Sequence, residues 1–239
     1  MAPPLMEELV EECLLRFPPD EPASLVRAAL VSKQWLRFIS DSGGGRFGRR
    51  FREFHRSPPL LGFICNQFEF DTGSSFVPTS PSFRPPNADR HGLRAVHSAH
   101  GRVLLHHMGG DAARSYQYHF VVWDPITDEQ RELPMGPPFL LNCDAAVLCA
   151  AGDDGCNHLG CQRGPFLVVF VGAELDKIVS CVYSSEADMW SEPIYTRGSY
   201  DFDEPGNKLL LGNALYFKPS KGSRCFWRLL LKYDLLTQV

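Results

Sequence analysis

The chain lacks any long hydrophobic run and any secretory signal. Among its 239 residues the uninterrupted apolar runs, such as residues 166–171, are far short of the ~20 residues that a membrane-spanning helix requires. The first turn of the chain carries acidic Glu7 and Glu8 rather than the basic and apolar segments of a signal peptide. We therefore expect an intracellular protein, cytoplasmic or nuclear, with no membrane partner.

The common catalytic motifs are missing as well. The sequence contains no nucleophile elbow, no paired-carboxylate site and no phosphate loop, because the glycines at residues 43–45 are not followed by Lys-Ser or Lys-Thr. Asp201, Asp203 and Glu204 cluster in a stretch with Pro205 and Gly206, which is typical of a polar loop. We predict that the protein is not an enzyme and takes no cofactor.

An excess of basic charge is also absent. The formal net charge is −4, and residues 57–239 carry 15 basic against 20 acidic side chains. A general nucleic-acid binder needs a basic surface, so this class is not expected. Five arginines lie within residues 46–56, but Phe47, Phe51 and Phe54 recur among them at helical spacing. This pattern favours a solvated face of an amphipathic helix over a phosphate site.

Close cysteine pairs are lacking. The eight cysteines are residues 13, 65, 143, 149, 156, 161, 181 and 225. A structural zinc site usually takes pairs of ligands two to four residues apart. The best metal candidate, residues 143–161 with His158, does not supply two such pairs, and a Gly-rich loop explains the segment without a metal. We predict free thiols and no metal site.

What the chain does have is a distinctive helical beginning. Residues 6–17 place apolar side chains on one helical stripe, at Met6, Leu9, Val10, Cys13, Leu14 and Phe17, with glutamates opposite. A Pro-Pro-Asp break follows at residues 18–20, then a short apolar helix at residues 25–31 and a helix that begins at Ser32. Three such helices are too few for a self-sufficient core. The stripe is therefore expected to be covered by another protein.

The order of these residues resembles an F-box from Leu5 to about Ser40. Leu5 matches the start of the family's pattern, residues 11–18 match its Glu-Glu-apolar-Leu-Leu-Arg-apolar-Pro segment, and Val31, Lys33 and Trp35 match its Val-x-Lys-x-Trp helix. The resemblance implies that the helices dock on a Skp-type adaptor and, through it, on a cullin of a RING-type ubiquitin ligase. The rest of the chain would then select the substrate.

The resemblance assigns a set of adaptor-binding residues. They are Leu5, Leu9, Leu14, Phe17, Pro18, Leu25, Val31, Lys33, Trp35 and Ile39. An alternative interpretation is that this apolar face is an internal core, used by a small helical cap that packs on the remainder of the chain.

Beyond residue 59 the helical periodicity gives way to short β-type runs separated by Gly, Pro, Asp and Asn. The predicted strands are residues 60–64, 93–97, 102–107, 119–123, 130–133, 145–149, 166–171, 178–183, 209–211, 215–217 and 226–233. Residues 72–92 contain four prolines and are predicted to form a long surface loop.

A weak repeat runs through these strands. An apolar run ending in an aromatic residue and a polar turn occurs at Trp123, Tyr183 and Tyr233, which lie 60 and 50 residues apart. This spacing is near the ~40–50 residue period of propeller blades. The region thus resembles the β-propeller of kelch-like, F-box-associated regions of the plant type. Three copies are too few for a closed ring of about four to eight blades, so the propeller is expected to be incomplete and the chain truncated.

The predicted fold class is therefore α+β, a small N-terminal three-helix F-box followed by an all-β, incomplete β-propeller. The predicted domains are an F-box at residues 1–45, a linking amphipathic helix at residues 46–58 and a partial propeller at residues 59–239.

The predicted function is the substrate-recognition subunit of an SCF-type (Skp-cullin-F-box) ubiquitin ligase, in which the propeller binds an unknown target protein. One alternative is a scaffold that binds the adaptor without delivering a target, or an inert truncated product. A second alternative, from another class, is a propeller enzyme or carbohydrate-binding protein.

Overall fold

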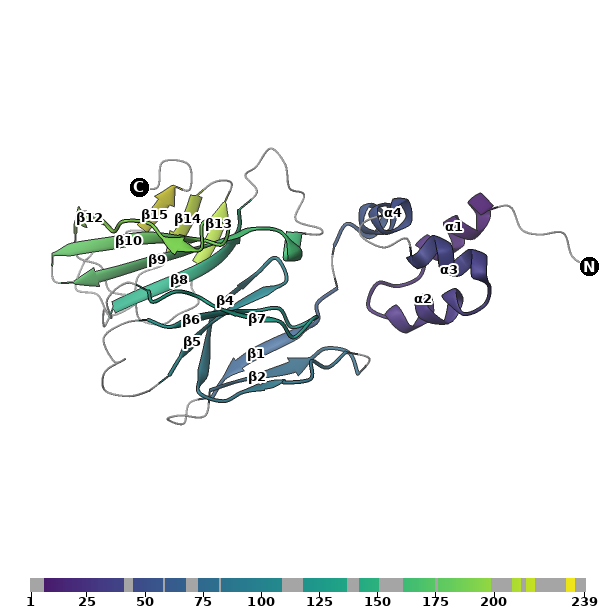
Figure 1. Cartoon of the computed structure of the whole chain (residues 1–239), viewed down its shortest axis with the longest axis horizontal. Helices are drawn as coiled ribbons and strands as arrows, with labels where there is room; N and C mark the ends of the chain where they lie inside the picture. Colours follow the sequence, from purple (N-terminus) through teal and green to yellow (C-terminus); the bar gives the residue numbers. More distant parts are fainter. Residues whose placement is uncertain are drawn as a thin grey trace, which may run out of the picture. The chain divides into compact units, whose positions relative to one another are not determined.

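A computed structural model describes residues 7–40, 45–57, 59–67, 73–81, 83–108, 118–136, 142–150, 161–174, 176–198, 208–211, 214–217 and 231–234. The chain forms two compact units, one of Met1–Phe63 with Val77–Arg84 and the other of Ile64–Phe76 with Pro85–Val239 (Figure 1). No helix in the described ranges is long and apolar enough to span a membrane.

The first unit contains four short helices. They are α1 (Glu7–Leu15), α2 (Pro22–Ala29), α3 (Lys33–Ser40) and α4 (Arg46–His55). Proline fits the first turn of α2 because that position needs no backbone donor. The Ser32 hydroxyl accepts a hydrogen bond from the Trp35 amide at 3.1 Å, which confirms Ser32 as the N-cap of α3.

The helices enclose a small apolar core. Its buried members come from α1, α2 and α4: Val10, Leu14, Leu15, Ala28 and Phe47. Around them pack the half-buried side chains of Phe17, Leu25, Trp35, Ile39 and Phe51. The fourth helix thus contributes Phe47 to the same core as α1 and α2, and this larger bundle has more apolar surface to bury than three helices alone.

Ion pairs and a hydrogen bond link α4 to α1. The guanidinium of Arg50 lies 2.6 Å from a carboxylate oxygen of Glu11 and 2.8 Å from one of Glu12. The hydrogen bond to Glu11 raises the pKa of Arg50 above its ordinary value. At the C-terminal end of α4, the His55 ring lies 2.9 Å from the carbonyl oxygen of Leu15. These contacts join the middle and the C-terminal end of α4 to α1.

Most of the strands belong to the second unit, and they are antiparallel and follow one another in order. The first sheet contains β1 (Gly62–Asn66), β2 (Ser74–Pro78) and β3 (Asp89–Arg90), of which Gly62, Phe63, Val77 and Pro78 are counted in the first unit. The second contains β4 (Leu93–Ala99), β5 (Arg102–His107), β6 (Phe120–Trp123) and β7 (Gln130–Glu132). The third contains β8 (Asn142–Cys149), β9 (Phe166–Glu174), β10 (Lys177–Ser184), β11 (Met189–Trp190) and β12 (Ile194–Arg197). The fourth contains β13 (Lys208–Leu211), β14 (Ala214–Phe217) and β15 (Leu231–Asp234).

The third sheet is four strands wide, because β11 and β12 pair with successive parts of β10. Figure 1 shows β8, β9 and β10 as its long adjacent strands. Alternate residues of these strands point to opposite faces. On one face Val147, Val168 and Phe170 join a core with β4–β6, while on the other Leu148 and Val169 join a core with Leu215 and Phe217 of β14. Both faces of the third sheet are therefore buried.

Two clusters of the same composition join successive sheets. In the first, the guanidinium of Arg90 stacks 4.0 Å from the centre of the Trp123 ring and pairs with Asp128, which also accepts the indole N–H at 3.0 Å. In the second, Arg131 lies 3.0 Å from Asp188, which accepts the Tyr183 hydroxyl at 2.7 Å. In each of these Arg–aromatic–Asp clusters the arginine comes from the preceding sheet, and both aspartates have positive φ, 61° and 54°.

The first strands of the sheets are linked by polar side chains. The buried Lys208 ammonium on β13 lies 2.6 Å from Asp144 on β8 and donates to the Val96 carbonyl on β4 at 2.9 Å. Burial lowers the pKa of Lys208 and raises that of Asp144, while their mutual attraction opposes both shifts. His97 on β4 accepts the Val147 amide of β8 at 3.3 Å. These contacts hold β4, β8 and β13 together.

The predicted fold class is confirmed at the level of α+β with a strand-rich C-terminal part. The aromatic residue of each predicted repeat lies in the third strand of its sheet, β6, β10 or β15. The prediction of a structureless loop at residues 72–92 is wrong, because β2 and β3 lie there. The sequence does not indicate these strands, because apolar and polar residues do not alternate clearly in them and the polar Ser74 and Arg90 are themselves buried. No closed ring of sheets is formed by the described strands.

His97 provides a test of the inner-strand contacts. Burial lowers the pKa of its imidazole to about 4, and the positive charge of Lys208 contributes. The unfolded state, with a pKa near 6.5, binds the proton more readily. His97 therefore contributes full stability above pH ~6.5, and loses at most about 3 kcal/mol as the pH falls toward 4. Urea unfolding between pH 7 and pH 4 measures this loss.

The matched variant is His97→Asn, whose side-chain oxygen can still accept the Val147 amide but does not titrate. Asp144 and Lys208 are present in both proteins, so the difference between the two pH profiles isolates the imidazole. We expect a flatter profile for His97→Asn below pH 6.5. Parallel profiles would show that His97 is not desolvated as described.

Candidate functional site

The first candidate site is an exposed apolar surface on the helices. Five large apolar side chains of α1, α2, the α2–α3 segment and α3 are largely exposed: Leu9 (52%), Val26 (59%), Leu30 (79%), Val31 (67%) and Leu36 (45%). Leu30 and Val31 end α2, where their amides donate to the carbonyls of the last turn. These five residues are called the helical apolar surface below.

The residues predicted to bind an adaptor divide into four groups. Leu5 lies outside the described residues. Leu9, Pro18, Val31 and Lys33 are exposed. Phe17, Leu25, Trp35 and Ile39 are half-buried against the helical core, and Leu14 is 1% exposed within it. The assignment of the whole set as adaptor-binding stays a prediction.

Three members of the helical apolar surface were not singled out from the sequence. They are Val26, Leu30 and Leu36. A sequence signal for two of them was present, because Val26 and Leu30 are four residues apart and so lie on one helical face. That face differs from the one carrying Leu25 and Ala28, which packs into the helical core.

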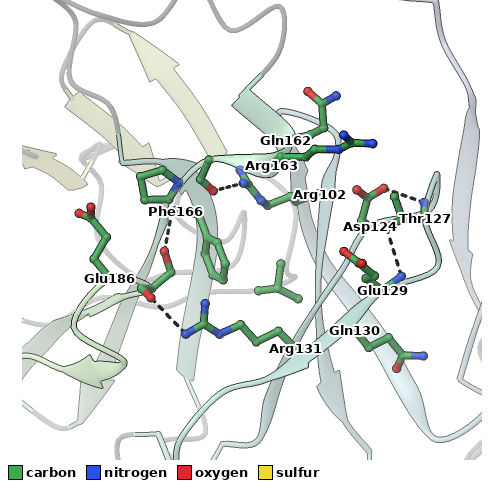
Figure 2. A pocket seen from close by; sticks show the side chains of 14 residues that line it. Arg102, Asp124, Thr127, Glu129, Gln130, Arg131, Gln162, Arg163, Phe166 and Glu186 are labelled. Atoms are coloured by element: carbon green, nitrogen blue, oxygen red, sulfur yellow. Dashed lines mark hydrogen bonds between the residues drawn. The ribbon is translucent and has the colours of Figure 1, made fainter. Parts of the chain in front are cut away.

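The second candidate site is a cavity of about 800 Å³ within the second unit, at strand ends of the second and third sheets (Figure 2). The second sheet contributes residues of β5, the end of β6, the β6–β7 turn and β7. The third sheet contributes the short 3-10 helix η1 (Cys161–Arg163), the start of β9 and the β10–β11 turn. This cavity is called the inter-sheet pocket below.

Arg102 is the most buried charged group of the inter-sheet pocket. His100 and Gly101 both have positive φ, 54° and 76°, and form the tight β4–β5 turn. Arg102 follows this turn as the first residue of β5. The Arg102 side chain is 4% exposed and donates at 2.9 Å to the Cys161 carbonyl and also to that of Gly164. Burial lowers its pKa. These bonds tie β5 to the segment that precedes β9.

Arg131 and Phe166 form the inner wall beside Arg102. The Arg131 guanidinium donates to the Ser185 carbonyl at 3.1 Å, in addition to its contact with Asp188. The guanidinium carbons of Arg102 and Arg131 lie 5.1 and 5.6 Å from the centre of the Phe166 ring. Figure 2 shows both arginines extending from the second sheet toward Phe166. Two cations thus share one aromatic ring.

Three acidic side chains also line the inter-sheet pocket. Glu129 and Glu186 are exposed, and half-buried Asp124 accepts the amides of Ile126 and Thr127 at 2.8 and 3.3 Å. The pocket therefore combines the buried Arg102 and the partly exposed Arg131 with exposed carboxylates. Sequence reasoning did not find this site, because its residues come from five separate segments.

Five described cysteines are free thiols: Cys13, Cys65, Cys143, Cys149 and Cys181. Cys13 and Cys65 are exposed, whereas Cys161 and Cys181 are buried. Within the described ranges no group of three or more His, Cys, Asp or Glu side chains could hold a metal ion. Cys156 and His158 of the metal candidate segment lie outside those ranges.

No protein-family model matches the chain, and no curated protein sequence matches it. The functional assignment therefore depends on the motif order of the helices and on the geometry of the two candidate sites.

The division between core and surface in the helices can be tested by stability. Leu14→Ala removes buried methyl groups and should lower the free energy of unfolding by about 3 kcal/mol. Val31→Ser, at a side chain that is 67% exposed, should change it by less than about 0.5 kcal/mol. Chemical unfolding followed by circular dichroism at 222 nm measures both, and equal losses would contradict the described packing.

Proposed function

We propose that this protein is the substrate-recognition subunit of an SCF-type ubiquitin ligase. In this proposal the helices bind a Skp-type adaptor, the adaptor connects them to a cullin, and the second unit binds the target protein. The protein itself performs no chemistry. It raises the effective concentration of target lysines near the charged conjugating enzyme.

The observation that carries the proposal is the helical apolar surface. The core of the helices is already filled by residues of α1, α2 and α4, yet Leu30 and Val31 remain 79% and 67% exposed at adjacent positions. Exposed apolar clusters commonly mark sites of protein interaction. Val31 is also part of the Val-x-Lys-x-Trp segment that resembles the F-box pattern, so motif and exposure coincide at one place.

The arrangement of strands supports a β-propeller-like second unit. Its sheets are antiparallel and consecutive in sequence, and two of the four are four strands wide, as propeller blades are. Side chains link the first strands β4, β8 and β13, as expected for strands that line a common axis. In such a unit the loops at strand ends are the usual ligand-binding elements.

The adaptor proposal predicts the effect of a double substitution on the helical apolar surface. Leu30→Asp with Val31→Asp places two charges where a bound adaptor would exclude water. Adaptor affinity should fall by a factor of about 100, because an unpaired charge buried in an interface costs about 3 kcal/mol or more. Calorimetric titration with a purified Skp-type adaptor measures this change.

Leu14 is unsuitable for this test, because a charge there would disrupt the helical core. The matched control is Ile126→Asp, a comparable change at a side chain that is 52% exposed in the β6–β7 turn. It should bind the adaptor as the unmodified protein does. Undiminished adaptor binding by the Leu30/Val31 variant, with both variants folded, would overturn the proposal.

A further inference from the structure

Arg102 is a buried cation with no carboxylate in contact among the described residues. Its side chain forms no ion pair in that part of the chain, and its hydrogen bonds go to neutral carbonyls. One terminal nitrogen, Nη1, is buried without a hydrogen-bond partner there. The Asp124 carboxylate attracts this charge without forming an ion pair with it, and a buried charge without a contacting counter-ion is costly. An anion in the adjoining pocket would compensate this cost.

The inter-sheet pocket is large enough to hold one extended side chain of a ligand peptide and parts of the residues next to it. Its volume of about 800 Å³ falls within the ~300–1,000 Å³ common for ligand sites. Phe166 offers an apolar wall, and the guanidinium of Arg131 faces the same ring as that of Arg102 (Figure 2). Planar guanidinium groups suit the two oxygens of a carboxylate.

The exposed carboxylates decide what kind of anion fits. Glu129, Glu186 and Asp124 balance the three arginines that line the pocket, Arg102, Arg131 and Arg163. A polyanion would be repelled by these carboxylates. A single carboxylate could reach the inner arginines, while basic groups on either side of it would be attracted to Glu129 and Glu186.

We propose that the inter-sheet pocket binds a peptide segment with one acidic side chain, held by Arg102 and Arg131, and with basic residues flanking it at Glu129 and Glu186. That this peptide segment belongs to a target of the ubiquitin ligase rests on the proposed function. Peptide binding itself does not involve the helical apolar surface, so the two proposals can fail separately.

The test uses four fluorescein-labelled nonapeptide pools and the full chain. Three pools have Glu, Gln or phosphoserine at the centre, with flanking positions drawn from Lys, Ala, Ser and Gly. The fourth has central Glu with Glu in place of Lys among the flanking residues. Fluorescence anisotropy gives a dissociation constant for each pool.

The pool with central Glu and basic flanks should bind best. We expect it to bind at least about tenfold more tightly than the Gln pool, because a desolvated charge pair contributes strongly to affinity. It should also bind more tightly than the phosphoserine pool and the acid-flanked pool. Equal binding of the Glu and Gln pools, tighter binding of phosphoserine, or no binding of any pool would overturn the proposal.

Substitutions in the pocket locate the site. Arg102→Met removes the charge with little change in length and should abolish the preference for Glu over Gln. Arg197→Met is the control, because Arg197 is 92% exposed on β12 and does not line the pocket. An unchanged preference in a folded Arg102→Met variant would place the peptide elsewhere.

The exposed carboxylates provide a second test that does not depend on Arg102. Glu129→Lys with Glu186→Lys changes two exposed side chains and leaves Arg102 bonded to the segment before β9. This variant should reverse the order of the basic-flanked and acid-flanked pools. An unaltered order would contradict the assigned orientation. Adaptor binding, measured on the same variants, should remain unchanged throughout.

Discussion

The second unit depends on the third sheet being apolar on both faces. The strand β9 begins with the apolar run Phe-Leu-Val-Val-Phe-Val, and alternation sends half of these side chains to each face. A sheet of this kind is stable in water only when a neighbour covers each side. β4–β6 cover one side, and β14 covers part of the other. The order of the sheets follows from that requirement.

In the helices, by contrast, not every apolar side chain is buried. Their core is closed by Phe47 of α4 and by the ion pairs of Arg50 with Glu11 and Glu12. Apolar side chains such as Leu30 and Val31 lie outside this core and are exposed. In the second unit burial on two faces builds the fold, whereas in the helices part of the apolar surface stays exposed.

The sequence predicts elements with strong periodicity and misses contacts between distant segments. Residues 102–107 were predicted as a strand and form β5, and the Ser32 cap follows from a local rule. The sequence alone does not distinguish a Leu14 that packs in a core from a Leu14 that binds a partner, because an apolar stripe has the same pattern in both cases. The inter-sheet pocket was not predicted, since Arg102 and Phe166 are 64 residues apart and meet only after the sheets pack. Asp128 and Asp188 each follow the aromatic residue of a repeat, Trp123 or Tyr183, by five residues. This shared spacing is a sequence signal for the two Arg–aromatic–Asp clusters.

The two Arg–aromatic–Asp clusters have a consequence for how such a chain can be divided. Each cluster takes its arginine from the last part of one sheet and its aromatic residue and aspartate from the next, as Arg131 does with Tyr183 and Asp188. A segment cut at the boundary between two of these sheets would lose one partner of the cluster that joins them. A segment that keeps a cluster intact therefore has to straddle that boundary.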